Sequence, residues 1–215
     1  MSIDTLEKYI ATADLDQLET LLSENPALAT TLTSQHVTPI MLSCYYKKPA
    51  VTDLLLKYVT DISLFEAAAA GKLAEIANLI YKQPESVNEY AKDGFTPLGL
   101  ACYFGHYDVA RYMVLKGADV NLPSSNGFKV YPLHSACAGN YTRTARMLIE
   151  NGALINVKQQ AGATPLHSAA QNGNLELLVL LLEHGAEVNA RMEGGKLPAD
   201  LASDKGFDEI AGILS

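Results

Sequence analysis

The chain has 215 residues, of which 48% are hydrophobic and 19% are charged, and its formal net charge is −8. This length corresponds to one or two ordinary domains, and the apolar fraction is that of a folded protein, which excludes disorder throughout the chain. The 24 acidic side chains outnumber the 16 basic ones, which argues against a nucleic-acid-binding protein with a broad basic face.

Helical patterns begin at the N-terminus and repeat along the chain. Residues 5–25 form the first predicted helical stretch. Thr38-Pro39 begins the next one, and the segment from Ile62 to Ala68 follows the same pattern without the proline. These early stretches are weaker versions of a motif that becomes clear after residue 93.

The clearest motif runs from Gly94 to His106 and reads Gly-Phe-Thr-Pro-Leu-Gly-Leu-Ala-Cys-Tyr-Phe-Gly-His. It recurs in outline with its proline at Pro97, Pro132, Pro165 and Pro198, in steps of 35, 33 and 33 residues. The first three copies are each followed by a second apolar stretch that ends in Gly-Ala-x-x-Asn. Each copy therefore predicts a pair of short helices, too small to fold alone and stacked on its neighbours.

This pattern resembles the ankyrin repeat family over nearly the whole chain. The most specific match is Thr164 to His167 together with Gly173 and Gly185-Ala186. The resemblance implies an all-α ankyrin-repeat solenoid: one domain of stacked helix-turn-helix units with β-hairpin-like fingers. We expect an N-terminal cap unit, five internal repeats and a C-terminal cap unit that closes the array, with the boundaries 1–33, 34–60, 61–92, 93–126, 127–160, 161–193 and 194–215.

Capping and turn residues support this frame independently of the resemblance. Thr96 and Thr164 are predicted to cap helices through their hydroxyl groups, and the prolines that follow suit the first helical position. Gly105 and Gly173 lie where a left-handed backbone ends the first helix of a pair. Asn140 holds that place in one unit, as the next-best residue for a positive φ.

Two irregularities mark the N-terminal half. The step from Pro39 to Ser63 is only 24 residues, so we expect a short turn at 58–62 and a notch in the row of fingers. The finger at 122–131 is two residues longer than the others. A second period of 58 residues relates Pro26 to Pro84 and Cys44-Tyr45 to Cys102-Tyr103. It predicts a duplicated two-repeat unit in which Tyr45 and Tyr103 have equivalent surroundings.

The compartment follows from what the chain lacks. Its longest purely aliphatic run, Leu177 to Leu182, is far shorter than the roughly 20 residues of a membrane span. The first residues contain acids where a secretion signal requires basic and then apolar residues. Three cysteines are too few for a disulfide scaffold. We therefore expect a cytoplasmic protein with reduced thiols and no membrane partner.

No catalytic, metal or cofactor site is predicted. Cys44, Cys102 and Cys137 occupy one repeated position and are expected to be small buried hydrophobes. The resemblance implies that His134 and His167 tie neighbouring turns together. The segment 194–197 lacks the upstream glycine and the hydroxyl residue of a phosphate-binding loop. We expect no cofactor, no bound metal and no small-molecule substrate.

The resemblance places partner binding at the finger tips and at the two helix positions before the inter-helix glycine. Eight of the sixteen Phe and Tyr residues map there: Tyr45, Tyr46, Tyr90, Phe95, Tyr103, Phe104, Phe128 and Tyr131. Large aromatic side chains that stacking does not require are typical of a binding hot spot. The alternative is that some of them fill the gap left by the missing finger or pack finger on finger, and Phe95 and Tyr131 are the first candidates for such a structural role.

The sequence therefore predicts a non-enzymatic protein-binding module that holds an unidentified protein partner with its concave face and finger tips, and that is itself monomeric. The alternative is a structural or regulatory scaffold that self-associates through its aromatic patch and has no groove ligand.

Overall fold

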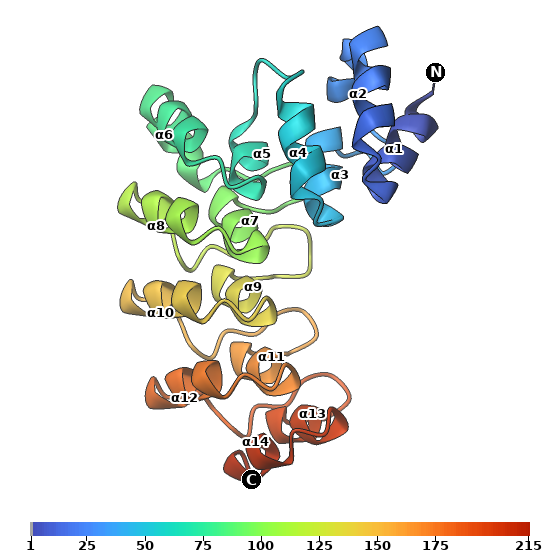
Figure 1. Ribbon diagram of the computed structural model, residues 1–215. Helices are drawn as coiled ribbons and strands as arrows, with labels where there is room; N and C mark the ends of the chain where they lie inside the picture. Colours follow the sequence, from blue (N-terminus) through green and yellow to red (C-terminus); the bar gives the residue numbers. More distant parts are fainter. Residues whose placement is uncertain (1) are drawn as a thin grey trace.

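The chain folds into seven pairs of antiparallel helices, as a computed structural model of residues 2–215 shows (Figure 1). The first helices of the pairs are α1 (Ile3–Thr12), α3 (Pro39–Tyr45), α5 (Leu64–Ala69), α7 (Pro97–Phe104), α9 (Pro132–Ala138), α11 (Pro165–Gln171) and α13 (Pro198–Asp204). The second helices are α2 (Leu15–Glu24), α4 (Pro49–Leu56), α6 (Leu73–Lys82), α8 (Tyr107–Leu115), α10 (Thr142–Glu150), α12 (Leu175–Glu183) and α14 (Asp208–Ile213). We refer to the pairs as units 1 to 7, and their exact boundaries stay a prediction.

The units stack in chain order and form an elongated molecule. Figure 1 shows α5, α7, α9 and α11 in one column and α6, α8, α10 and α12 in a second column beside it, whereas α1–α4 lie to one side at the N-terminal end. Each first helix from α5 onward packs closely on the next, but α3 packs on α5 much less extensively. The stack is therefore regular from unit 3 to unit 7 and loosened between units 2 and 3.

Small residues make the close stacking possible. The first helices bury alanine and cysteine at repeated positions, so neighbouring backbones approach each other, and leucines such as Leu100 fill the remaining space. The three cysteines are buried and unpaired, as predicted. Burial raises the pKa of the Cys44 thiol to about 11, so this group stays protonated and unreactive at neutral pH.

The helix termini follow the predicted capping pattern with one difference. The Thr96 hydroxyl accepts a hydrogen bond from the Gly99 amide at 3.0 Å, which confirms the predicted cap. Thr164 places its hydroxyl 2.9 Å from Nδ1 of His167, and its amide donates to the same Nδ1 at 3.1 Å, so the two residues form a capping box. The residue at the third helical position differs between the units. In unit 6 it is His167, whose ring lies within hydrogen-bond distance of the Thr164 hydroxyl, whereas in unit 4 it is Gly99.

Left-handed residues end the first helices. Gly105 has φ of 79° and Asn140 has φ of 60°, as predicted. The corresponding residue in unit 2 is Lys47, with φ of 54°. A side chain at such a position costs conformational energy that glycine avoids.

The fingers are turns, and residues 2–215 contain no β-strand. Backbone hydrogen bonds between residues four apart close the turns, as from the Ala91 amide to the Phe95 carbonyl at 2.9 Å. In the longer finger the bond runs from Ser124 to Val130, two residues farther apart. Residues 57–63 join α4 directly to α5, which confirms the short connection. Within the residues described the fingers are thus hydrogen-bonded turns, and their β-hairpin-like character is not confirmed.

The 58-residue period is visible in the backbone. The 3-10 helices η1 (Pro26–Thr30) and η2 (Pro84–Asn88) occupy equivalent places after α2 and α6. The residues that precede them, Asn25 and Gln83, have φ of −143° and −142° with the same ψ of 78°. The duplicated two-repeat unit therefore persists as local geometry.

Candidate partner-binding surface

Three of the eight predicted site residues form an aromatic cluster: Tyr45, Tyr103 and Phe104. The Tyr45 ring centroid lies 5.5 Å from that of Phe104 and 6.4 Å from that of Tyr103. The tilted and edge-on ring orientations are those that aromatic pairs favour. Rings from units 2 and 4 meet because unit 3 offers only Ala69 and Ala70 at the equivalent positions.

Tyr45 and Tyr103 do not share equivalent surroundings, contrary to the prediction from the 58-residue period. Tyr45 is half-buried and donates a hydrogen bond from its hydroxyl to Asp93 at 3.2 Å. Burial raises the pKa of the Tyr45 hydroxyl, and the negative charge of Asp93 raises it further. Tyr103 keeps 46% of its surface exposed. The two rings contact one another across unit 3, so one covers the other instead of repeating its role.

Two further tyrosines are exposed and only lightly held. Tyr46 follows α3, is 40% exposed, and accepts a hydrogen bond from the Gln35 side chain at 3.2 Å. Tyr90 lies in the finger after η2 and donates to the Pro123 carbonyl of the next finger at 3.1 Å. Tyr90 therefore links two fingers while 42% of its surface stays exposed.

The remaining three site residues lie apart from the aromatic cluster. Phe128, in the longer finger, is 61% exposed. Phe95 is half-buried and packs against the core, in line with the structural role expected for it. Tyr131 precedes α9 with its ring centroid 5.7 Å from that of His134. The predicted surface is thus one compact cluster with separate contributions from the fingers.

Rings stacked on glycines connect the units in a way that the sequence analysis missed. A Cβ atom on Gly71 would lie 2.5 Å from the His106 ring, and one on Gly105 would lie 2.4 Å from the Tyr141 ring. Phe207 covers Gly173 in the same manner. The covering residues precede α8, α10 and α14, so each ring closes over the left-handed glycine of an earlier unit. The signal was the large residue that directly follows each inter-helix turn.

Histidines tie the C-terminal turns together, as the resemblance implied. Nε2 of His134 donates to the Ala163 carbonyl at 2.9 Å, and Nε2 of His167 donates to the Lys196 carbonyl at 3.3 Å. Burial lowers the pKa of His134 to about 4, so the ring is neutral at pH 7. Its Nδ1 atom is buried without a hydrogen-bond partner among residues 2–215.

Asparagines add a second set of ties along the other edge of the stack. The side-chain amide of Asn121 donates to the Gly152 carbonyl, while its oxygen accepts from the Leu154 amide. Asn88 and Asn156 make the same paired contacts with the units that follow them. Both hydrogen bonds are 2.8–3.0 Å long in each case, so these ladders fix the spacing of neighbouring units.

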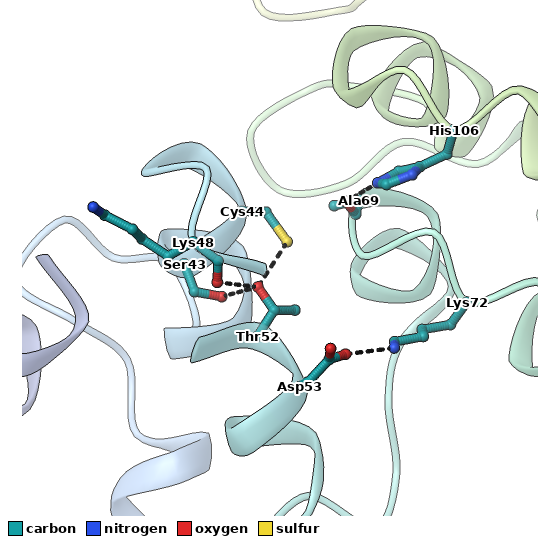
Figure 2. A network of polar contacts seen from close by, with 8 residues as sticks. All are labelled: Ser43, Cys44, Lys48, Thr52, Asp53, Ala69, Lys72 and His106. Atoms are coloured by element: carbon teal, nitrogen blue, oxygen red, sulfur yellow. Dashed lines mark hydrogen bonds and ion pairs between the residues drawn. The ribbon is translucent and has the colours of Figure 1, made fainter. Parts of the chain in front are cut away.

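The junction of units 2 and 3 has different ties. Glu66, which is only 9% exposed, accepts hydrogen bonds from the Thr38 hydroxyl at 2.6 Å and from the Ser63 amide and hydroxyl. Figure 2 shows the second link, an ion pair between Lys72 and Asp53 with Nζ and Oδ1 2.7 Å apart. A pocket of about 360 Å³ opens beside this junction, and Tyr103 and Phe104 form part of its wall.

The described residues hold neither a clustered metal-ligand set nor a membrane-spanning helix. Residues 2–215 contain no group of three or more His, Cys, Asp or Glu side chains that could hold a metal ion. No helix within the same range is both long and apolar enough to cross a bilayer.

Comparison with known proteins gives one consistent match. The family model for three-copy ankyrin repeats matches residues 9–124 and 64–159, and the model for many-copy ankyrin repeats matches residues 148–202. Matches of this extent cover most of the helix pairs.

Individual relatives are distant and differ in size. Alpha-latrocrustotoxin-Lt1a of Latrodectus tredecimguttatus is 29% identical over 66% of this chain and 10% of its own length. The RelA-associated inhibitor of Mus musculus is 30% identical over 44% of this chain and 11% of its own length. Protein phosphatase 1 regulatory subunit 27 of Mus musculus is 29% identical over 50% of this chain and 68% of its own length. The chain thus spans only a small part of the first two relatives.

These matches agree with the stacked helix pairs, the left-handed inter-helix residues and the histidine-tied turns. The chain belongs to the ankyrin repeat family, whose repeats serve generally as protein–protein interaction modules.

Proposed function

We propose that this chain is a non-enzymatic module that binds a protein partner along its concave face and finger tips. The observation that carries the proposal is the exposure of large aromatic side chains at positions that stacking does not require. Tyr46, Tyr103 and Phe128 are 40%, 46% and 61% exposed. Aromatic side chains supply a large contact area at low entropic cost, which is why they dominate binding hot spots.

The rigidity of the stack supports the same function. First helices from α5 to α13 are held by buried contacts, and the turns are tied by histidine and asparagine side chains. A surface built on such elements loses little conformational entropy when a partner docks. Among the relatives, one is named as a regulatory subunit of a phosphatase and another as an inhibitor associated with RelA, names that fit regulation by binding.

The test is affinity capture from native lysate, followed by affinity measurement with the captured protein. We expect Tyr103→Ala to weaken binding by about 2 kcal/mol or more, and a Tyr46/Tyr103 double alanine variant to lose the partner. Tyr81→Ala is the matched control, because Tyr81 is 86% exposed on α6, outside the proposed surface. The thermal midpoint of unfolding is measured for each variant.

Three outcomes contradict this proposal. Equal capture of the partner by the double variant and the wild type would show that Tyr46 and Tyr103 do not belong to the interface. A collapse of thermal stability in Tyr103→Ala makes the aromatic cluster part of the core. A sedimentation coefficient that depends on protein concentration would show that the chain binds a second copy of itself. The chain would then be a self-associating scaffold.

A further inference from the structure

The loosened junction of units 2 and 3 lacks the ring that closes the inter-helix turns of three other junctions. In units 4, 5 and 7 the residue before the second helix is His106, Tyr141 or Phe207, and its ring covers an earlier glycine. In unit 3 that residue is Lys72, and the residue it would cover is Lys47. Lys72 instead reaches sideways to Asp53, so the space over the turn stays open.

The open space is the pocket of about 360 Å³. Its lining is mainly apolar: Ala69 and Ala70 lie on unit 3, Cys44 on unit 2, and Tyr103 and Phe104 on unit 4. Figure 2 shows Cys44 and Thr52 on one side of the gap and Ala69 and His106 on the other. The volume falls in the roughly 300–1,000 Å³ range of sites that take organic groups. One large apolar side chain fits such a space.

The charged groups at the pocket favour an anionic neighbour. Asp53 lines the pocket but is neutralised by Lys72. Lys47 also lines it, and within residues 2–215 no carboxylate lies within ion-pairing distance of its ammonium. Lys48 lines it too, although Figure 2 shows its ammonium directed away from the gap. An unpaired cation beside an apolar pocket is complementary to an acidic residue next to a large apolar one.

Lys47 also occupies a conformation that its side chain makes costly. Its φ of 54° matches the place where Gly71 and Gly105 have φ of 70° and 79°. Strained residues persist where the surrounding structure or a function requires them. Here the strained residue supplies the unpaired charge at the pocket.

We propose that this pocket takes a large apolar side chain from an acidic, extended segment of the partner protein, with Lys47 pairing a carboxylate of that segment. The proposal rests on the proposed function and specifies the chemistry of the partner. The pocket adjoins the aromatic cluster through Tyr103 and Phe104, so a segment seated in it continues onto the proposed binding surface. An occupant of another kind, such as a free small molecule or a second copy of this chain, is an outcome of the test.

The probe is a set of fluorescein-labelled ten-residue peptides added to the full chain and followed by fluorescence anisotropy. The central residue is Leu, Phe, Trp or Ala, and the flanking residues are Glu, Ser or Lys. We expect Glu-flanked peptides with a large apolar centre to bind most tightly. The alanine-centred peptide is expected to bind about tenfold more weakly. Added salt is expected to weaken the binding of the Glu-flanked peptides.

Two variants assign the binding to the pocket. Ala70→Leu fills it at a residue whose backbone is helical, and is expected to weaken binding about tenfold. Lys47→Glu is expected to abolish the preference for Glu over Lys flanks. Lys129→Glu is the matched control, since Lys129 is exposed and also left-handed, with φ of 58°, but lies on the longer finger. Far-ultraviolet circular dichroism verifies that each variant is folded.

Several results overturn this proposal. They are equal affinity for all central residues, no loss with Ala70→Leu, and an equal effect of Lys47→Glu and Lys129→Glu. Saturation by an uncharged small aromatic compound without a peptide preference assigns the pocket to a small molecule. Dimerisation that Ala70→Leu abolishes assigns it to a second copy. One further result is that the peptides bind nowhere on the chain while Tyr103→Ala still weakens binding of the captured partner. That result disproves the pocket as a binding site and leaves the proposed function in place.

Discussion

The junction between units 5 and 6 and the junction between units 2 and 3 join the same kind of helix pair by different contacts. Between units 5 and 6, His134 and Asn156 bond to backbone carbonyls of the next unit, and Asn172 donates back to the Ala138 carbonyl. Between units 2 and 3, the described side chains provide one buried carboxylate, Glu66, and one ion pair at the surface, between Lys72 and Asp53.

This difference shows where the stack can vary without losing its core. The buried alanines and leucines continue through both junctions, so the hydrophobic core runs the length of the molecule. The ties between turns lie at the edge of that core, where their loss opens a pocket instead of unfolding the units. In a repeat protein each unit interacts only with its neighbours, so we expect a weak junction to divide the stack into two cooperative blocks.

The largest effect is expected from removing the carboxylate at the weak junction. Glu66→Ala leaves the Thr38 hydroxyl and the Ser63 amide without the partner they have in the folded chain. Hydrogen bonds to a charged group contribute about 1.5–3 kcal/mol each, and water replaces part of what Ser63 loses because that residue is exposed, so we expect a loss of about 3 kcal/mol in the free energy of unfolding. Urea denaturation followed by circular dichroism measures this loss.

The same variant tests whether the junction divides the stack. Hydrogen exchange is expected to become faster in α1–α4 than in α7–α12, because the two blocks no longer unfold together. Glu66→Gln is the control, since its amide oxygen still accepts one of the hydrogen bonds. Uniform exchange along the whole stack in Glu66→Ala would contradict the division into two blocks.

A smaller effect, of opposite sign, is expected from exchanging turn residues between the junction of units 2 and 3 and the ring-closed junction of units 4 and 5. Gly105→Lys adds a side chain at φ of 79° and displaces the Tyr141 ring, which costs about 1–3 kcal/mol. Lys47→Gly relieves the strain at φ of 54° and is expected to gain less than about 1 kcal/mol, because glycine also gains entropy in the unfolded chain. Urea midpoints measure both changes. A loss of stability in Lys47→Gly would mean that the lysine side chain itself holds the junction together.

The sequence predicted the periodic features well, because they depend on residues that repeat. The left-handed Gly105 and Asn140, the cap at Thr96, the buried cysteines and the missing finger all follow from local patterns. The aromatic cluster did not follow, because Tyr45 reaches Tyr103 only through the absence of side-chain bulk in unit 3. The ion pair of Lys72 was equally hidden, since its partner Asp53 lies 19 residues earlier on a helix whose placement no local pattern specifies.

One effect joins stability to function, and it is expected at Tyr131. Its counterpart in unit 6 is Thr164, whose hydroxyl and amide lie 2.9 and 3.1 Å from Nδ1 of His167. The equivalent Nδ1 of His134 has no partner within residues 2–215. Tyr131→Thr supplies the missing hydroxyl and is expected to raise the free energy of unfolding by about 1 kcal/mol.

The same substitution removes a ring from the proposed binding surface, so we expect weaker binding of the captured partner together with higher stability. Tyr131→Phe separates the two effects, because it keeps the ring and supplies no hydroxyl near His134. Isothermal titration and urea denaturation of the same samples measure both quantities. A Tyr131→Thr variant that binds the partner as tightly as the wild type would mean that this tyrosine only packs on its own unit. A variant that is more stable but binds more weakly would mean that the chain lacks a hydrogen bond at His134 because it keeps a ring for its partner.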